Sequence, residues 1–487
     1  MKAENMEQKQ FETDLDGLFR PASFAHVGAS SRDQVGRYNY IAFMKKMKFR
    51  GKLYPVNPKH QEVLGLKCYS SLASIPEDVD LVVMSLRAPQ CAEVLQEMPD
   101  GKVRFVIIHS SGFGEIGKND LEQKIASLGR EKGFRIIGPN CMGLYSRQGR
   151  VAFWDDQHEM VDRPGSLGFI SQSGGIAINM ISAAKEVGVN FDKVISLGNQ
   201  IDISINEVLQ YMGEDESIRV IGAYVEDVKD GRTFQTKIKN ISPHKPVLIW
   251  KGGLTEVGKV AAMSHTGALA GDEKVFLSAM RQAGAILVDT FPQMLRAMRL
   301  LQPPFPPPGE RLAILCGGGG MTVNISDMFS DQPNVELPRL TPETQEKLQD
   351  LLPEENIYIK NPVDSGSTGF TKIDQILQAV GEDPHIESIL IVVEVNYLSD
   401  FYSYKARGSV INEISELILN ASAKIGKPIF INIMQLPDNR EDYYHSRRLL
   451  IDKFNEEKIP WLDGSFKEVA ETFNRLAGYS KYLKANR

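Results

Sequence analysis

The stretch Leu167-Gly-Phe-Ile-Ser-Gln-Ser-Gly-Gly175 joins a short apolar run to a turn of small residues, and the segment after it, Ile176–Val187, has a helical pattern. The same order recurs at Phe24-Ala-His-Val-Gly-Ala-Ser-Ser31 and at Leu312-Ala-Ile-Leu-Cys-Gly-Gly-Gly-Gly320. A parallel α/β unit begins in this way, with a strand, a turn rich in glycine or serine, and a helix. The three openings therefore predict an α/β protein with three doubly wound domains.

Other apolar runs fit the strands of these sheets, because buried parallel strands are short and continuously apolar. They are Leu53–Val56, Leu81–Leu86, Phe105–His109, Val220–Val225, Val247–Trp250, Ser388–Val393 and Pro428–Ile433. The connector Leu301–Glu310 holds five prolines in ten residues, which can continue neither a helix nor a central strand. A second, less distinct boundary lies in the polar stretch Tyr145–Pro164. We therefore expect domains over residues 17–148, 160–300 and 309–484.

Composition excludes several classes of protein. The chain has 487 residues, of which 42% are hydrophobic and 24% charged, the balance of a globular protein and not of a disordered or disulfide-built one. Its 56 basic and 62 acidic residues give a net charge of −6, so we expect no nucleic-acid partner. The apolar runs are too short to span a bilayer, so we expect no membrane segment.

The cysteines and histidines show no spacing typical of a metal site. The four cysteines form no CxxC pair, and the eight histidines form no HExxH motif, so no structural zinc is expected. Scattered cysteines in a chain of this size suit a reducing compartment, and the polar N-terminus is unlike a secretory signal. These features predict a cytoplasmic location.

The first turn, Gly28 to Gly36, departs from the GxGxxG dinucleotide fingerprint but can still bring backbone N–H groups to a phosphate. Two later strand ends carry Lys59 and the segment Ser110-Ser-Gly-Phe113. Because the carboxyl ends of neighbouring strands share one crevice in a doubly wound sheet, these residues can meet the same phosphate ligand. Plain structural turns are the alternative interpretation.

The second turn, Ser171-Gln-Ser-Gly-Gly175, offers backbone N–H groups suited to a phosphoryl group. It also loosely resembles a nucleophile elbow with Ser173 as the serine, although Ser171 replaces the first glycine of that motif. A purely structural turn is the third interpretation.

The segment Ala261–Gly271 places His265 among small residues, where an accessible imidazole can act as base, ligand or nucleophile. No second histidine stands at metal spacing, which favours base or nucleophile. Glu226 ends an apolar run, where a carboxylate can orient an imidazole. The alternatives without a catalytic role are that His265 is a structural histidine and that Glu226 is a solvent-exposed acid.

Together these segments resemble the α subunit of the NDP-forming acyl-CoA synthetases, the acetate–CoA ligase (ADP-forming) group of the succinyl-CoA synthetase superfamily. The resemblance extends over about residues 17–484. Its segments, in chain order, are Val27-Gly-Ala-Ser30, Leu53–Lys59, Ser111–Glu115, Gly138–Gly143, Phe169–Gly175, Ser196–Asp202, Tyr224–Gly231, Ser264–Gly271 and Asn361–Asp364.

The resemblance implies a Rossmann-like CoA-binding domain followed by two flavodoxin-like ligase domains. It implies that His265 is the phosphorylated histidine, that Glu226 holds its imidazole, and that Ser173, Gly174 and Gly175 bind the phosphoryl group. The residues that it places on CoA-contacting segments are Gly28, Ser30, Ser31, Gly36, Lys59, Ser111 and Gly112. Where the family often has a turn rich in proline and alanine, this chain reads Ser85-Leu-Arg-Ala-Pro89, and Arg87 is counted with the CoA-binding residues: it either adds a contact to a CoA phosphate or alters that site.

The implied reaction joins a small carboxylic acid to CoA, with ATP converted to ADP and phosphate, through a phosphohistidine and an acyl phosphate. No ATP-grasp region is evident in the chain. We therefore expect a separate ATP-grasp β subunit that brings ATP and Mg, a hetero-oligomeric enzyme, and no ATP-dependent activity of this chain alone.

Two other functions remain open at this stage. One is a serine hydrolase with Ser173, Asp202 and His265, which follow one another in the order found in α/β-hydrolases. The other is a non-catalytic, regulatory CoA-binding protein built on a ligase scaffold.

Overall fold

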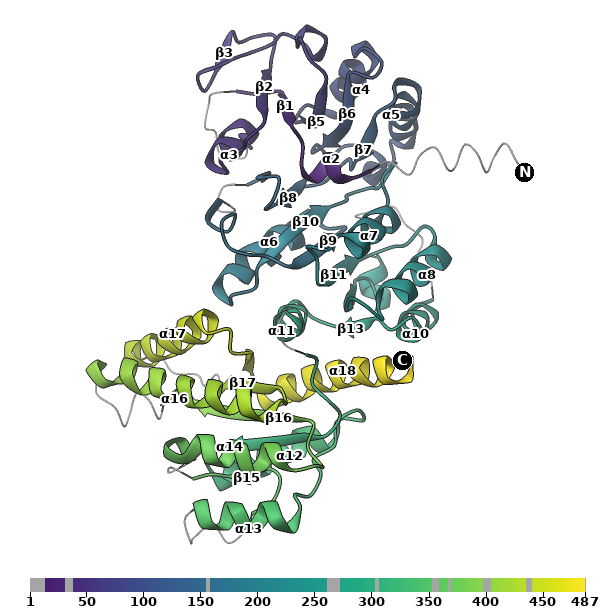
Figure 1. Cartoon of the computed structure of the whole chain (residues 1–487). Helices are drawn as coiled ribbons and strands as arrows, with labels where there is room; N and C mark the ends of the chain where they lie inside the picture. The colour runs from purple at the N-terminus through teal and green to yellow at the C-terminus, as the bar shows by residue number, and fades with distance from the viewer. Residues whose placement is uncertain are drawn as a thin grey trace. The chain divides into compact units, whose positions relative to one another are not determined.

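The computed structural model describes residues 14–30, 38–154, 158–260, 272–302, 306–352, 359–366, 369–396, 404–434 and 440–486. The chain divides into two compact units, Met1–Ala285 and Ile286–Arg487. Figure 1 shows both units coloured along the chain. Three of the predicted site residues, Ser31, Gly36 and His265, lie outside the described residues.

The first sheet consists, in the described part of the chain, of parallel strands in the order β2-β1-β5-β6-β7. Its strands are β1 (Ser23–Val27), β2 (Lys52–Val56), β5 (Val79–Met84), β6 (Val103–Ile108) and β7 (Arg135–Ile137). Its helices are α2 (Asp16–Phe19), α3 (Tyr40–Lys46), α4 (Ala88–Glu97) and α5 (Asn119–Lys132), and a small hairpin is formed by β3 (Glu62–Val63) and β4 (Leu66–Lys67). Helices α4 and α5 lie side by side (Figure 1). The chain order reverses between β1 and β5, which is where such sheets open a crevice.

The second sheet of this unit repeats that pattern. Strands β10-β9-β11-β12 are parallel neighbours, and β8 pairs antiparallel with β10 at the edge. The strands are β8 (Leu144–Ser146), β9 (Leu167–Ser171), β10 (Phe191–Ser196), β11 (Val220–Val225) and β12 (Val247–Lys251). The helices are α6 (Gly174–Glu186), α7 (Ile205–Glu214), α8 (Gly231–Ile241) and α10 (Glu273–Gln282). Here the reversal falls between β9 and β11.

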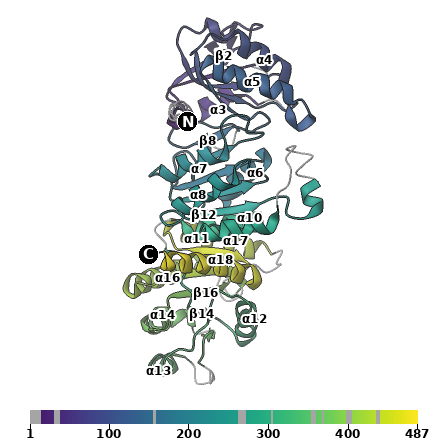
Figure 2. The same cartoon turned by 90° about the vertical axis from the view of Figure 1, so that its right-hand side faces the viewer.

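The second unit holds a third sheet of parallel strands, in the order β15-β14-β16-β17-β18. Its strands are β14 (Leu312–Cys316), β15 (Val363–Asp364), β16 (Ser388–Glu394), β17 (Ile429–Met434) and β18 (Trp461–Gly464). Strand β13 (Ile286–Val288), which comes earlier in this unit, is not part of this sheet. Its helices are α11 (Phe291–Leu301), α12 (Gly319–Ser330), α13 (Pro342–Leu351), α14 (Ile373–Glu382), α16 (Tyr404–Ile425), α17 (Glu441–Glu456) and α18 (Phe466–Ala485). Helix α12 lies on one side of β14 and β16, while α14 and α16 lie on the other (Figure 2).

The predicted fold class is confirmed, because each of the three quoted openings forms a strand that ends in a turn. The three turns follow β1, β9 and β14, and each of these strands is fully buried. Every other apolar run quoted above also falls on a strand, namely β2, β5, β6, β11, β12, β16 or β17. The proline-rich connector separates α11 from β14.

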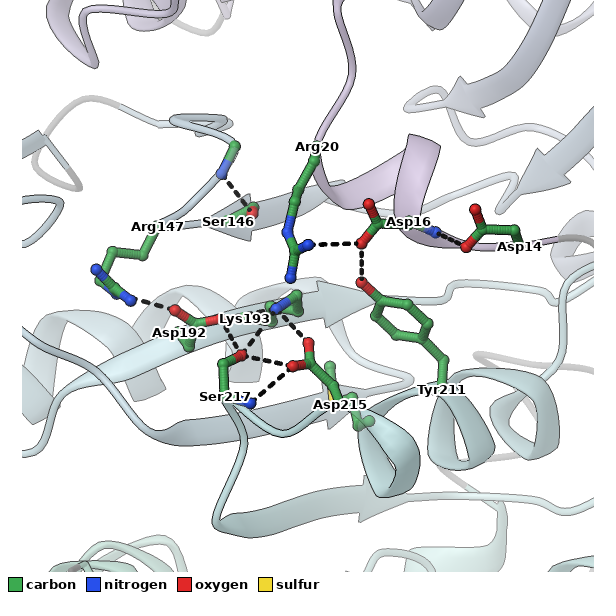
Figure 3. A network of polar contacts seen from close by, with 12 residues as sticks. Asp14, Asp16, Arg20, Ser146, Arg147, Asp192, Lys193, Tyr211, Asp215 and Ser217 are labelled. Atoms are coloured by element: carbon green, nitrogen blue, oxygen red, sulfur yellow. Dashed lines mark hydrogen bonds and ion pairs between the residues drawn. The ribbon is translucent and has the colours of Figure 1, made fainter.

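A buried ionic cluster joins the short helix α2 to the second sheet (Figure 3). The fully buried Nζ of Lys193 lies 2.7 Å from Asp192 Oδ2 and 2.5 Å from Asp215 Oδ2. Ser217 Oγ donates to the same two carboxylates. Burial alone would raise the pKa of Asp215, but the hydrogen bonds from Lys193 and Ser217 outweigh burial and hold this pKa below its usual value.

An aromatic pair completes the contact between α2 and α7. Phe19 stacks on Tyr211 with ring centroids 5.1 Å apart, and Lys193 Nζ lies 5.9 Å from each ring. The Tyr211 hydroxyl donates to Asp16 Oδ1 at 3.1 Å, and Arg20 pairs with the same carboxylate. Charge and apolar area therefore act together to attach α2, at the start of the first domain, to the second sheet.

Two further findings concern only the described residues. None of their helices combines the length and the apolar character needed to cross a membrane. They also bring together no group of three or more histidine, cysteine, aspartate or glutamate side chains that could hold a metal ion.

Candidate active site

The strand register places the first four strand ends of the first sheet side by side. Val27 pairs with Val56 and with Met84, and Met84 pairs with Ile108. The residues that follow these four positions therefore emerge at one edge. The described members of the predicted CoA set lie there: Gly28 and Ser30 after β1, Lys59 after β2, Arg87 after β5, and Ser111 and Gly112 after β6.

Hydrogen bonds tie the first two of these turns together. Gly28 N donates to Val56 O at 2.9 Å, and Asn57 Nδ2 donates to Ala29 O at 2.8 Å. Gly28 has a φ of +94°, and a Cβ at this position would lie 3.1 Å from Ser85 O, so the turn requires glycine. The exposed Lys59 follows this bonded pair of turns, as the proposed shared phosphate site requires.

The turns after β5 and β6 also approach one another. Arg87 is exposed and directly precedes α4, and a Cβ on Gly112 would lie 3.6 Å from Ala88 Cβ. Below this edge, His26 Nε2 lies 2.6 Å from Ser85 Oγ. Burial, followed by the nearby His109, lowers the pKa of His26 to about 3, so this imidazole is neutral and supports the turn without titrating.

The turn of the second sheet that is predicted to bind phosphate forms the N-terminus of α6. Ser173 is its N-cap, and the Ser173 Oγ accepts from Ile176 N at 3.4 Å. The buried Ser171 holds the turn from the strand side, because its hydroxyl donates to Ser173 O at 2.6 Å and accepts from Ser173 N at 3.1 Å. The backbone N–H groups of Gly174 and Gly175 begin the helix, so the positive end of the α6 dipole is presented there.

Gly174 and Gly175 offer a matched pair of substitutions. A Cβ on Gly174 would collide with Met142 Cγ, whereas a Cβ on Gly175 would have no neighbour within 4 Å. We expect Gly174→Ala to lower the free energy of unfolding by about 1–3 kcal/mol through overpacking. Gly175→Ala is expected to change it by less than about 1 kcal/mol, in the stabilising direction, because alanine is the better helix former. Urea denaturation of both variants measures the difference, and equal effects would contradict the close contact with Met142.

Glu226 lies across the chain reversal from this turn. Strand β11 pairs directly with β9, with Tyr224 opposite Ser171, and Gln172 N donates to Tyr224 O at 3.2 Å. Glu226 is half-buried and begins the loop after β11. Gly175 and Glu226 are 51 residues apart in the sequence. The fold nevertheless brings the predicted phosphate-binding turn and the predicted carboxylate to the ends of adjacent strands.

His265 belongs to the segment 261–271, which lies outside the described residues. The described chain resumes at Asp272, which caps α10 by accepting from Val275 N at 3.1 Å. The role of His265 therefore remains a prediction.

Asn199 connects the two sheet edges. Its Nδ2 donates to Glu115 Oε2 at 2.7 Å and to Glu122 Oε1 at 2.7 Å. Glu115 Oε1 in turn accepts from the N–H groups of Gly112 and Phe113. Burial alone would raise the pKa of Glu115, but the hydrogen bonds from Gly112 and Asn199 hold it below its usual value. The loop that carries Ser111 and Gly112 is thus joined to the domain of the second sheet by hydrogen bonds to the carboxylate of Glu115.

Asp202 has partners unrelated to a serine triad. Its carboxylate accepts from Arg135 Nε at 3.1 and 3.0 Å and from Ile136 N at 2.7 Å. A triad aspartate instead accepts from the histidine that activates the serine. The engagement of Asp202 by Arg135 therefore favours a structural role over the hydrolase alternative.

Four residues near the site were not predicted from sequence: Asn199, Gln172, Tyr224 and Lys251. Each is a polar residue at or just beyond the end of a strand, which is the signal that could have drawn attention to it. The side chains of Gln172 and Lys251 hydrogen-bond to the peptide groups of Glu226, and the Tyr224 hydroxyl lies near its carboxylate.

Comparison with known families finds two domains, which together match most of the first unit and the first residues of the second. A CoA binding domain matches residues 22–147, and a succinyl-CoA ligase like flavodoxin domain matches residues 164–301. These are the domains of a CoA ligase, and they contain the two strand edges described above.

Individual relatives extend the match along the chain. The acetate–CoA ligase (ADP-forming) I subunit alpha of Pyrococcus furiosus is 30% identical over 479 residues, which cover 96% of this chain and 98% of that one. The acetate–CoA ligase (ADP-forming) of Methanocaldococcus jannaschii is 35% identical over 352 residues, which cover 72% of this chain and 49% of that one. The chain thus aligns with about half the length of the second relative.

A solved structure shares the fold over nearly the whole chain. It is the dinucleotide forming acetyl-coenzyme A synthetase 1 of Ca. Korarchaeum cryptofilum in complex with phosphate and ADP, with a TM-score of 0.83, 25% identity, and coverage of 97% of this chain and 99% of that one. The chain belongs to the ADP-forming acetate–CoA ligase family, as the resemblance in the sequence implied.

Proposed function

We propose that this chain is the α component of an ADP-forming acyl-CoA ligase, which joins a small carboxylic acid to CoA. The observation that carries the proposal is the placement of the Ser173–Gly175 turn and Glu226 on adjacent strand ends, joined through Asn199 to the Ser111–Gly112 loop. The name of the Pyrococcus furiosus relative, an α subunit, supports this function, as does the phosphate and ADP held by the Korarchaeum structure.

The chemistry proceeds in three balanced steps. An imidazole nitrogen of His265 attacks the γ-phosphorus of ATP, and ADP leaves. The acid's carboxylate oxygen then attacks that phosphorus, which breaks the P–N bond, frees His265 and forms an acyl phosphate. Finally the CoA sulfur attacks the acyl carbon, the C–O bond to phosphate breaks, and phosphate departs with the thiol proton. Phosphorylation is needed because a free carboxylate has no good leaving group.

Each proposed residue has a physical task in these steps. The backbone N–H groups of Gly174 and Gly175 stabilise phosphate charge at the N-terminus of α6. Glu226 accepts a hydrogen bond from one imidazole nitrogen of His265, which leaves the other nitrogen as the nucleophile. Gly28, Ser30, Ser31, Gly36, Lys59, Arg87, Ser111 and Gly112 hold CoA at the edge of the first sheet, where Lys59 and Arg87 supply positive charge.

The nucleotide is proposed to reach His265 from a separate ATP-grasp β subunit, to which ATP binds together with Mg. The enzyme would then be a hetero-oligomer, and this chain alone would not use ATP. This chain alone would still catalyse the last two steps in reverse, in which an acyl-CoA and phosphate give an acyl phosphate and CoA, and the acyl phosphate then phosphorylates His265. Neither of these steps uses the nucleotide that the β subunit binds.

The proposal predicts a phosphorylated form of the isolated chain. Incubation with radiolabelled phosphate and an acyl-CoA from a panel of acetyl-CoA, butyryl-CoA and phenylacetyl-CoA is expected to label the protein with at least one thioester. The label should be lost in acid and retained in alkali, as a phosphoramidate is. ATP alone should leave the chain unlabelled, and addition of the β subunit should permit labelling by ATP.

Other outcomes identify the alternatives. An acid-stable label, or stoichiometric modification of Ser173 by a serine-directed phosphonate, would support the hydrolase function instead. Tight CoA binding without any labelling, even beside the β subunit, would support a regulatory CoA-binding protein.

A further inference from the structure

The side chain of Gln172 bridges the two halves of the candidate site. Gln172 directly follows β9 and is only 8% exposed. Its Oε1 accepts from Asp227 N at 2.9 Å and from Glu226 N, and its Nε2 donates to Asp227 O at 2.6 Å. One amide side chain therefore binds both peptide groups at the start of the loop after β11.

The position of Gln172 in the chain makes this bridge relevant to the phosphate turn. Its next neighbour, Ser173, caps α6, and Ser171 before it fixes the turn through two hydrogen bonds. Gln172 N also donates to Tyr224 O at 3.2 Å. The backbone and the side chain of Gln172 together fix the distance between the proposed phosphate turn and the Glu226 loop. The two segments lie on either side of the point where the chain order of the sheet reverses.

Two other side chains act on Glu226. Lys251 Nζ, at the end of β12, donates to Glu226 O at 2.7 Å. The Tyr224 hydroxyl lies near enough to the Glu226 carboxylate for that charge to act on it. Burial, followed by the charge of Glu226, raises the pKa of Tyr224 well above its usual range, so this hydroxyl remains a donor. The Glu226 N–H and carbonyl are thus bound by the side chains of Gln172 and Lys251.

We propose that Gln172 is a positioning residue for phosphoryl transfer, which sets the placement of the Glu226 carboxylate relative to the N-terminus of α6. The proposal rests on the proposed function, because it assigns Gln172 to the same site. Gln172 donates no atom to the reaction and contacts neither phosphate nor acid. It acts through Glu226, since an imidazole held by a displaced carboxylate would present its nitrogen to phosphorus at the wrong position.

The test uses two substitutions of similar size and one matched control. Gln172→Met keeps the length of the side chain and removes all three bridging hydrogen bonds. Gln172→Glu retains the acceptor for the two N–H groups but cannot donate to Asp227 O. The control is Gln293→Met in the second unit, because Gln293 is 5% exposed, accepts from Asp289 N at 2.9 Å and donates to Glu471 at 2.8 Å.

The measurement is the single-turnover rate of labelling by radiolabelled phosphate and the acyl-CoA that labels the wild type. We expect Gln172→Met to lower this rate by about 100-fold and Gln172→Glu to lower it by a smaller factor. CoA affinity, measured by calorimetry, should stay within about twofold of wild type in both, because the CoA edge belongs to another sheet. Gln293→Met should retain the wild-type rate.

Three results would overturn the proposal: labelling of Gln172→Met at the wild-type rate, a parallel loss of CoA binding in both Gln172 variants, or an equal loss of rate in Gln293→Met. A labelled wild type with slow Gln172 variants supports it. If the wild-type chain itself takes up no label with any thioester or with ATP and the β subunit, the proposed function fails first, and that failure is separate from a failure of the role of Gln172.

Discussion

Replacement of His265 by asparagine is expected to abolish phosphate labelling of the chain, a loss of at least about 10³-fold in rate. Asparagine has a similar shape, but its amide nitrogen shares its electron pair with the carbonyl and does not attack phosphorus. Glu226→Gln is expected to have a smaller effect, of about 10- to 100-fold, because the imidazole remains while its orienting charge is removed. The measurement is the rate and final amount of acid-labile label.

His244→Asn provides the matched control for this substitution. His244 is an exposed histidine that follows α8 in the same domain and lies outside the proposed site, so its replacement should leave labelling unchanged. Retained label in His265→Asn would contradict the phosphohistidine. An effect of Glu226→Gln as large as that of His265→Asn would instead assign Glu226 a direct part in the transfer.

Replacement of Lys193 by methionine is expected to lower the free energy of unfolding by about 3–5 kcal/mol, because it leaves buried carboxylates without their central cation. Asp192 is fully buried and Asp215 nearly so, and both accept from Lys193 Nζ. Asp192 would keep Arg147 and Ser217 as partners, and Asp215 would keep Ser217 alone among the contacts described above. Urea denaturation of the wild type and the variant measures this loss in the free energy of unfolding.

Lys52→Met tests whether burial is the reason for this effect. Lys52 pairs with Glu77, but the two side chains are 60% and 50% exposed, so its loss should leave the free energy of unfolding nearly unchanged. If both variants lost the same stability, burial of the Lys193 cluster would not explain its effect.

The effect of Lys193→Met should also depend on pH. The pKa of Asp215 is lowered in the folded chain from 3.8, so its ionised form contributes stability above that pH. This contribution disappears as the pH falls through the lower folded-state pKa. The stability difference between wild type and Lys193→Met should therefore shrink as the pH falls from about 4 toward that lower pKa, where the Asp215 carboxylate of the folded chain gains a proton.

Part of the fold could be predicted because its signals are local. An apolar run followed by a glycine or serine turn identifies a buried parallel strand with its helix, as at β1, β9 and β14. Strand β10 was not among the predicted strands, because Asp192 and Lys193 interrupt its apolar pattern. Their charges are paired with Asp215 and Arg147, and Ser217 donates a hydrogen bond to Asp192; all three partners come from other parts of the chain. The edge strand β8 was also missed, since its three residues lie in a polar stretch.

The sequence by itself determined the α/β class, the family, and the residues proposed to carry phosphate, CoA and the acid's activation, because motif identity and strand–turn–helix order are properties of short segments. Only the tertiary structure decided which of these segments meet. The chain order reverses between β9 and β11, so Gln172 reaches Glu226, and Asn199 reaches Glu115 of the other domain. Hydrogen bonds act over about 3 Å, and whether residues far apart in sequence come that close depends on strand order and packing.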